Sequence, residues 1–240
     1  LCTWHCGNMR NAIPFEGSVV VTVPKENVEN VKNAAKEWEK IFNNEYKGIE
    51  NAIAVVVEET EAPKTQVPEE IQDNLVDAIY ACHNGVMRYI PSIPEVVETS
   101  SNLAIIDIED GSARIKILAR SASESQKEYI ATALESCFSM VGMNVEFGGS
   151  YMGWDPNPDS EMMRIMEAIY EREFGVKPRV TVVHAGLECS VILSKYPGLD
   201  IVSFGPTLES PHTSKERCQI STMPKFWTLL VKTLEEVPAK

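Results

Sequence analysis

The chain has 240 residues, of which 44% are apolar, and its 35 acidic and 22 basic side chains give a net charge of −13. Such a chain is long and apolar enough to bury a substantial core, in two domains or in one elongated domain. The strong negative charge argues against a nucleic-acid partner and a membrane-surface role, and no apolar run reaches the roughly 20 residues that a membrane span requires.

The first residues of the chain carry two of its six cysteines. Cys2, His5 and Cys6 resemble half a zinc site, but no second ligand pair follows at zinc-finger spacing, and the surrounding residues favour a strand. The other cysteines are scattered, several within helical apolar patterns, which is typical of reduced thiols in the core of a cytoplasmic protein. We therefore predict a strand at this end of the chain and no disulfide framework.

Two segments, 8–18 and 102–112, align without gaps and suggest an internal duplication. Each segment continues into a β-branched run and then into a helical pattern. We interpret the aligned Gly17 and Gly111 as parts of hairpin turns, in which glycine supplies a positive φ. Each copy then has the order strand, turn, strand, helix, strand, which is a split β-α-β unit.

Periodic apolar patterns place helices and further strands in this part of the chain. The predicted helices span residues 25–46, 69–84 and 123–141, and the predicted strands span 51–58 and 143–147. In the first helix one apolar face is formed by Val28, Val31, Ala35, Trp38 and Phe42. Proline-containing breaks at 63–68 and 91–94 lie on either side of the segment that contains the second predicted helix. Two such units could pair edge to edge into one sheet with helices on one face.

The pattern changes after Gly148 and Gly149, where a turn-rich linker leads to Asp159 and Ser160, a pair suited to cap a helix. The predicted helices beyond the linker span 161–174, 187–195 and 222–236, and the predicted strands span 179–183 and 200–204. This alternating order is typical of a layered α/β domain with a parallel or mixed sheet. Two strands make only part of such a sheet, so we expect an α/β fold completed by strands outside this chain.

The candidate functional residues follow the two predicted strands of this second part. His184 ends one strand and Glu188 lies four residues later, at the edge where open α/β sheets bind their ligands. The alternative for His184 is a buried histidine bonded to a local carboxylate. Gly205 ends the other strand and would let a substrate carboxylate or amide approach the main chain closely.

His212 lies in a polar loop that follows Pro211. A loop histidine can offer a neutral imidazole to a metal, and Glu216, four residues later, could orient it by a hydrogen bond. The alternative is a solvated loop histidine. One histidine cannot hold a catalytic metal alone, so the other ligands of such a site are expected outside this chain.

Several of these segments resemble one known family. They are His184-Ala-Gly-Leu-Glu188, the run from Tyr196 to Gly205-Pro206-Thr, the Pro211-His212 loop, the closing helix from Phe226, and Cys6-Gly-Asn-Met-Arg-Asn11-Ala-Ile-Pro14. Together they resemble the aminoacyl-histidine dipeptidases, the Xaa-His or carnosine-cleaving members of the acylase and carboxypeptidase superfamily of co-catalytic zinc peptidases. The resemblance covers the chain, patchily between about residues 45 and 95.

The resemblance implies a domain plan. Residues 1–148 would be most of a lid that mediates homodimerisation, and residues 149–240 would be the closing part of a zinc-peptidase catalytic domain. The remaining metal ligands and the general base would lie on an amino-terminal half that this sequence does not include. The chain alone is then expected to be an inactive part of a cytoplasmic dipeptidase, with no nucleic-acid or membrane partner.

The resemblance also implies residue roles. His212 would be the last ligand of a two-zinc site, Asn11 would contact an oxygen of the transition state, and Arg120 would take the terminal carboxylate of the dipeptide. The substrate pocket would be lined by His184, Glu188 and Gly205. For Arg120 the alternative is a solvated arginine at a strand end.

Two positions depart from the family pattern and bear on specificity. The family loop reads His-Ser-Pro-Asp-Glu, whereas this chain has Lys215 in place of the aspartate, and Phe15 replaces the arginine of the Asn11 motif. A related dipeptidase or acylase with another side-chain preference is therefore the alternative within enzymes. Outside that class, the alternative is a binding or dimerisation module.

Overall fold

The computed structural model describes residues 1–50, 52–61, 63–150, 152–154, 157–182, 187–211 and 215–238. The chain forms two compact units. The first unit comprises Leu1–Asn84, Ser101–Leu118 and Ser136–Asn144, and the second comprises Gly85–Ser100, Ala119–Glu135 and Val145–Lys240. Strands β4 and β5 and helix α3 each belong partly to both units. A domain boundary near residue 148 therefore stays a prediction.

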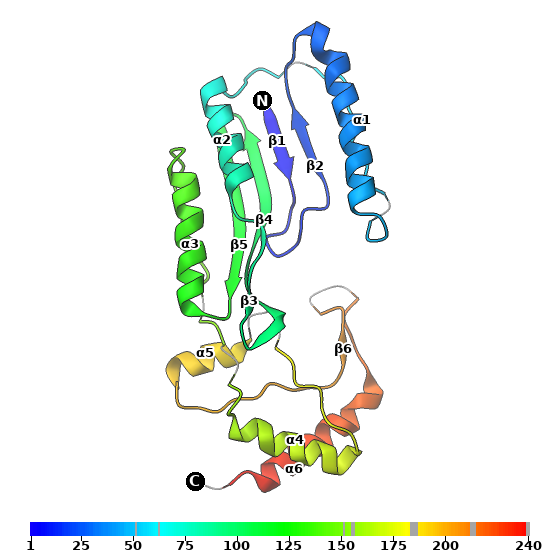
Figure 1. Cartoon of the computed structure of the whole chain (residues 1–240), viewed down its shortest axis with the longest axis vertical. Coiled ribbons are helices and arrows are strands. Elements are labelled where there is room, and N and C mark those ends of the chain that lie inside the picture. The colour runs from blue at the N-terminus through cyan, green and yellow to red at the C-terminus, as the bar shows by residue number, and fades with distance from the viewer. Residues whose placement is uncertain are drawn as a thin grey trace. The chain divides into compact units, whose positions relative to one another are not determined.

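The described elements are mixed α and β (Figure 1). The helices are α1 (Val28–Glu45), α2 (Glu69–Ala81), α3 (Glu124–Ser139), α4 (Glu161–Phe174), α5 (Glu188–Lys195) and α6 (Met223–Glu236), with 3-10 turns at Lys25–Asn27 and Ile220–Thr222. The strands are β1 (Thr3–Cys6), β2 (Gly17–Val20), β3 (Gly85–Ile90), β4 (Ile93–Glu109), β5 (Ser112–Ser121), β6 (Leu208–Glu209) and β7 (Arg217–Cys218).

The first unit is built on an antiparallel sheet in which β1 lies between β2 and β4. His5 on β1 lies opposite Ser18 on one side and Asp107 on the other. Strand β5 pairs with β4 through the tight turn Asp110–Gly111, where both residues have positive φ values of 50° and 76°. Two residues with positive φ match the turns that join twisted antiparallel strands. The hairpin turn predicted at Gly111 is therefore confirmed.

Helix α2 covers one face of this sheet (Figure 1). Leu75 of α2 packs against Ile106 and Ile108 of β4, and all three are buried. The partly buried residues around them are Leu1, Trp4, Cys6, Val67, Ile79, Leu103, Ile115 and Met143. Because successive side chains of a strand point to opposite faces, Asp107, between Ile106 and Ile108, points to the other face. That uncovered face, called the open face below, carries polar side chains.

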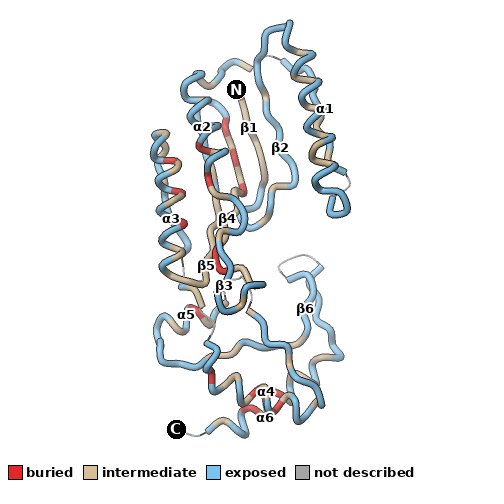
Figure 2. Tube along the Cα trace, viewed as in Figure 1, coloured by how far each residue is buried: buried red, intermediate tan, exposed pale blue. Residues whose placement is uncertain are grey.

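The second unit has its core between α4 and α6, where Met166 and Ile169 pack against Leu229. In Figure 2 the buried residues of the two helices lie where the helices meet. The pair is also joined at its surface, where Arg172 donates from Nη1 and Nη2 to both carboxylate oxygens of Glu236, at 3.1 and 2.5 Å. Strands β6 and β7 form a separate two-stranded ribbon.

The amino-terminal end of α4 is held by a polar cap. Ser160 Oγ accepts a hydrogen bond from the Met163 N–H at 3.0 Å and donates one to Asp200 Oδ1 at 2.6 Å. Asp200 Oδ2 accepts from the Met162 N–H at 2.9 Å. These hydrogen bonds, first the one from Ser160, lower the pKa of the Asp200 carboxyl below its ordinary value. The predicted cap at Ser160 is confirmed, and Asp200 extends it.

We expect Asp200→Asn to lower the free energy of unfolding by about 1 kcal/mol at pH 7, because one charged acceptor of the cap is lost. A carboxyl with a lowered folded-state pKa stabilises fully above its unfolded pKa, about 3.9, and loses that effect as pH falls through the folded pKa. The wild-type chain should therefore lose stability in that acid range by more than Asp200→Asn does. Urea unfolding from pH 7 to pH 3 measures this. Asp159→Asn, whose carboxyl is outside the cap, is the matched control and should retain the wild-type slope.

The predicted helices are confirmed, whereas several predicted strands are wrong. No strand forms in the described residues of 51–58, 143–147, 179–183 and 200–204. A strand needs a partner edge to pair with, which a local apolar pattern cannot supply. Strand β3 and the first half of β4 were missed, because the predicted break at 91–94 is a tight turn at Pro91 and Ser92 followed directly by the start of β4 at Ile93.

The proposed residue alignment of the duplication is also wrong. Residues 8–16 form an irregular loop between β1 and β2, whereas the aligned residues 102–109 are strand β4, and Gly17 starts β2 and is not part of a turn. The order strand, strand, helix does occur twice, as β1–β2–α1 and β4–β5–α3. The two hairpins differ in the length of their connection, which a gapless alignment could not accommodate.

Candidate functional site

Asn11 lies in the loop between β1 and β2, and this loop is fixed on both sides of it. Asn102 Nδ2 of β4 donates to the carbonyl oxygens of Arg10 and Ala12, at 3.3 and 2.8 Å. At the start of the loop, the Gly7 N–H donates to Glu16 O at 3.2 Å. The exposed Asn11 amide is therefore presented from a main chain that is anchored to the sheet of the first unit.

Gly7 permits this anchoring, because the loop starts in close contact with β4. Gly7 has φ of +69°, and a Cβ built there would lie 2.0 Å from Ala104 O, a main-chain atom. Only glycine fits both the left-handed conformation and the space. The sequence signal was present, since Gly7 lies within the Asn11 motif, but its role as the contact point with β4 was not predicted.

Arg120 lies near the end of β5 and is half-buried. The neighbouring backbone is well fixed: Thr99 Oγ1 and Ser121 Oγ are 2.9 Å apart, and the Ala122 N–H donates to Glu98 O at 3.0 Å. Within the described ranges, the Arg120 guanidinium has neither a hydrogen-bond acceptor nor an ion-pair partner. Its fork of donors can therefore take a carboxylate in bidentate fashion.

Glu188 and Gly205 lie in the second unit and are exposed. Glu188 is the first residue of α5, and Gly205 follows Phe204, whose ring packs 5.5 Å from that of Phe226. A Cβ at Gly205 would meet no atom within 4 Å, so the main chain there is open to a ligand. In the part of the chain that the structure describes, no hydrogen bond or ion pair joins Arg120, Glu188 and Gly205.

His184 and His212, the predicted pocket residue and metal ligand, lie outside the described residues. Glu216, expected beside His212, is described and exposed, immediately before β7. Asn11 belongs to the first unit and the other described candidates belong to the second. The structure thus places Asn11, Arg120, Glu188 and Gly205 individually, and the assembly of the predicted residues into one site stays a prediction.

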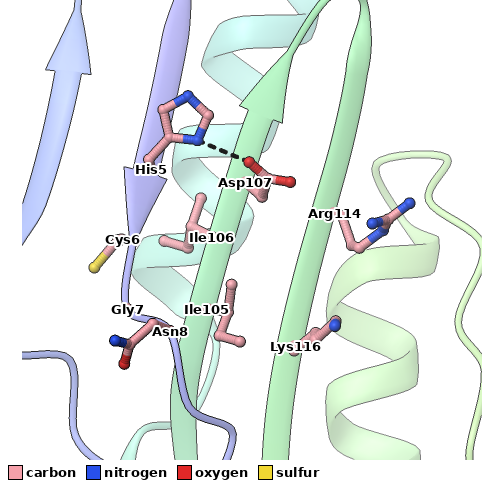
Figure 3. Close-up of a pocket in the computed structure, with 9 residues that line it drawn as sticks. All are labelled: His5, Cys6, Gly7, Asn8, Ile105, Ile106, Asp107, Arg114 and Lys116. Carbon is pink, nitrogen blue, oxygen red and sulfur yellow. Dashed lines mark hydrogen bonds and ion pairs between the residues drawn. The ribbon is translucent and has the colours of Figure 1, made fainter.

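The described residues do not fit a metal site of their own. They contain no group of three or more His, Cys, Asp or Glu side chains arranged to hold an ion. His5 is close to two carboxylates: its Nδ1 is 2.7 Å from Asp107 Oδ1 (Figure 3), and its Nε2 is 3.8 Å from Glu109 Oε2. Cys6, the next residue, packs against the opposite, buried face. The strand prediction for this segment is confirmed, and all six cysteines are free thiols.

A hollow that the sequence reasoning missed lies on the open face of the first unit (Figure 3). It has a volume of about 250 Å³, and its lining residues are His5, Cys6, Gly7, Asn8, Ile105, Ile106, Asp107, Arg114 and Lys116. Polar residues at alternate positions of β4 and β5 were a signal for it, because alternate residues share a face of a sheet. The hollow therefore depends on how three strands pair, not on one local motif.

Among the described helices, none combines the length and the apolar character needed to cross a membrane.

Comparison with known proteins identifies the family. The model of peptidase family M20/M25/M40 matches residues 16–236. The cytosol non-specific dipeptidase of Escherichia coli (strain K12) is 33% identical over 240 residues, which are 100% of this chain and 50% of that protein. The succinyl-diaminopimelate desuccinylase of Helicobacter hepaticus is 20% identical over 152 residues, 63% of this chain and 38% of that protein.

Among solved structures, the aminoacylhistidine dipeptidase of Vibrio alginolyticus matches with a TM-score of 0.90 and 38% identity. The match covers 100% of this chain and 49% of that one. The chain thus spans about half the length of the two dipeptidases that it matches over its whole length. On the match of the family model over most of its residues, the chain belongs to peptidase family M20/M25/M40.

Proposed function

We propose that this chain is the carboxyl-terminal half of a zinc-dependent dipeptidase. The observation that carries the proposal is the whole-length likeness to a solved aminoacylhistidine dipeptidase, with a TM-score of 0.90 and 38% identity. The E. coli relative, a cytosol non-specific dipeptidase, supports the same reaction class and a cytoplasmic location. Dipeptides ending in histidine are the proposed substrates. A broader range of dipeptides is the alternative, which the likeness to the non-specific dipeptidase of E. coli favours.

The carboxyl-terminal helix supports the presence of a further part of the catalytic domain. On α6 and the turn before it, Ile220, Trp227 and Leu234 are 83%, 63% and 70% exposed, although Leu229 of the same helix is buried against α4. A helix with a second, uncovered apolar side is expected to pack against more protein. In the proposal, that protein is the amino-terminal half of the catalytic domain.

The residues of this chain would then bind and orient the dipeptide. Arg120 would hold the terminal carboxylate, Asn11 would donate to the oxygen that becomes negative, and His184, Glu188 and Gly205 would line the pocket. His212 would complete the zinc coordination, with the other ligands and the general base on the amino-terminal half. Activation of water and polarisation of the peptide carbonyl would come from bound zinc.

The lid assigned to residues 1–148 is proposed to form a homodimer. In support, β2 and β5 are edge strands of the sheet in the described part of the first unit. Such edges are pairing surfaces unless they are covered. Light scattering of the purified chain tests this: a mass of two chains supports the dimer, and a mass of one chain at micromolar concentration contradicts it.

Hydrolysis of dipeptides tests the main proposal. The polypeptide that contains this chain as its carboxyl-terminal half should hydrolyse Xaa-His dipeptides in the presence of zinc, and the 240-residue chain alone should not. Hydrolysis by neither would contradict the dipeptidase assignment and favour a binding or dimerisation module. Robust hydrolysis by the 240-residue chain alone would contradict the proposed division of the active site.

Arg120→Lys should raise KM for dipeptides by roughly tenfold to a hundredfold, because a bidentate charged hydrogen-bond pair is worth about 1.5–3 kcal/mol. The lysine keeps the charge but not the fork. Arg179→Lys, the same change at an exposed position, is the control and should leave KM unchanged. Initial rates against dipeptide concentration measure both variants. An unchanged KM in Arg120→Lys would favour the solvated strand-end arginine.

A further inference from the structure

The open-face hollow of the first unit combines opposite charges around an apolar floor. Its floor is Ile105 of β4, with Arg114 and Lys116 on the β5 side and Asn8 on the β1 side (Figure 3). Asp107 lies beside Ile105 along β4. All of these residues belong to the first unit. We propose that the hollow binds a small zwitterion, a free amino acid or short peptide, whose carboxylate lies between Arg114 and Lys116 and whose ammonium group lies at Asp107.

The pairing of the strands sets this arrangement. The turn of Asp110 and Gly111 places Glu109 opposite Ser112, so Asp107 faces Arg114 and Ile105 faces Lys116 across the β4–β5 pair. On the other side, Asp107 faces His5 of β1. One row across the sheet is therefore His5, Asp107, Arg114, and the adjacent row contains Ile105 and Lys116.

The two cations are available to a ligand. Within the described ranges, Arg114 and Lys116 have no hydrogen-bond or ion-pair partner, although the whole chain has a net charge of −13. Two positive charges on the same side of one strand repel each other, and a carboxylate between them removes that repulsion. An anionic group is therefore the favoured neighbour of this pair.

Asp107 supplies the complementary charge. Its Oδ1 is 2.7 Å from His5 Nδ1, whereas its other oxygen points towards the β5 side of the hollow (Figure 3). No ion pair joins Asp107 to Arg114 among the described residues, so this oxygen can accept from an ammonium group. Asp107 makes the β4 side of the site anionic, whereas Arg114 and Lys116 make the β5 side cationic.

The size of the hollow limits the ligand. The hollow lies over Ile105, between Asn8 on the β1 side and Lys116 on the β5 side (Figure 3). The volume of about 250 Å³ is below the roughly 300–1,000 Å³ of sites for drug-sized molecules. Ile105 would contact an apolar side chain of the ligand, which favours leucine over glycine.

Titration of the purified 240-residue chain with leucine, followed by NMR at the Ile105 methyl group, tests the site. Saturable binding with a Kd in the millimolar range is expected, as for a few contacts by a small ligand. N-acetylleucine, which lacks the ammonium group, and leucine methyl ester, which lacks the carboxylate, should each bind about tenfold more weakly. No shift at Ile105 with leucine would overturn the proposal. Phosphate competing as well as leucine would mean an anion site only and would also overturn it.

Two variants assign the two ends of the ligand. Lys116→Met should weaken leucine binding about tenfold, and Asp107→Asn should weaken leucine but leave N-acetylleucine unchanged. Both positions are on the exposed face, so the fold should be kept, and far-ultraviolet circular dichroism checks this. Lys36→Met, an exposed lysine on α1, is the control and should bind leucine as the wild type does. Wild-type leucine affinity in Lys116→Met contradicts the proposed carboxylate contact.

Discussion

Gly7→Ala is expected to destabilise the chain by more than about 3 kcal/mol. The added Cβ would lie 2.0 Å from Ala104 O, and the residue would have to keep φ of +69°. The obstructing atom is main chain, so it cannot move aside without shifting β4 relative to β1. The pairing of Cys6 with Ile106 is next to this contact and would be disturbed.

Gly111→Ala separates the two causes. Gly111 has a similar φ of +76°, but a Cβ there would meet no atom within 4 Å. This variant carries only the conformational cost of a left-handed residue, about 1 kcal/mol. Urea unfolding of both variants measures the difference. Equal losses in Gly7→Ala and Gly111→Ala would show that the contact with β4 contributes nothing and that the loop bearing Asn11 is not anchored as described.

His212→Ala should have the largest effect on activity. In the polypeptide that contains this chain as its carboxyl-terminal half, loss of the proposed ligand should lower kcat/KM for dipeptides about 1,000-fold, or about 4 kcal/mol of transition-state stabilisation. It should also lower the amount of zinc that the protein retains through dialysis. Steady-state kinetics and elemental analysis of the same preparation measure both effects.

His83→Ala is the matched control for this prediction. His83 Nδ1 is 2.8 Å from Ser101 Oγ in the first unit, and no metal role is assigned to it. Its loss should leave the zinc content unchanged. If His212→Ala keeps both its zinc and its activity, His212 is a solvated loop histidine, and the residue correspondence with the zinc peptidases is wrong at this position.

The sequence was sufficient to place the helices. Predicted and observed ends agree within three residues for every helix, from α1 to α6. Their apolar periodicity and their caps are local signals, as Ser160 at the start of α4 shows. The closing helix was also predicted correctly. The exposure of Leu234 on it could not be predicted, because apolar periodicity does not say how many sides of a helix are covered.

Strands were harder to predict, because pairing is not local. Residues 200–204 have an extended, apolar pattern and form no strand, whereas Asp200 at their start is used to cap α4. In contrast, β4 runs through a region in which no strand was predicted before residue 102. The hairpin turn at Gly111 was predicted correctly, since Asp-Gly fixes that geometry by itself.

The candidate site residues also differ in how far the sequence alone could identify them. Asn11 and Arg120 came from the resemblance alone, whereas Glu188 and Gly205 were first proposed from their positions after predicted strands. The structure adds why two of them are suited to their proposed roles: the Asn11 loop is anchored through Asn102, and the Arg120 guanidinium has no partner in the described ranges. The open-face hollow required the register of three strands and could not be predicted from sequence.

The zinc content of the purified 240-residue chain tests the central claim most directly, namely that this chain contributes a single ligand to a two-zinc dipeptidase site. Elemental analysis after dialysis should find well below one zinc ion per chain, because one histidine does not hold the metal and the described residues contain no other ligand cluster. Two tightly held zinc ions per chain would contradict the claim and show that the chain carries a complete metal site by itself.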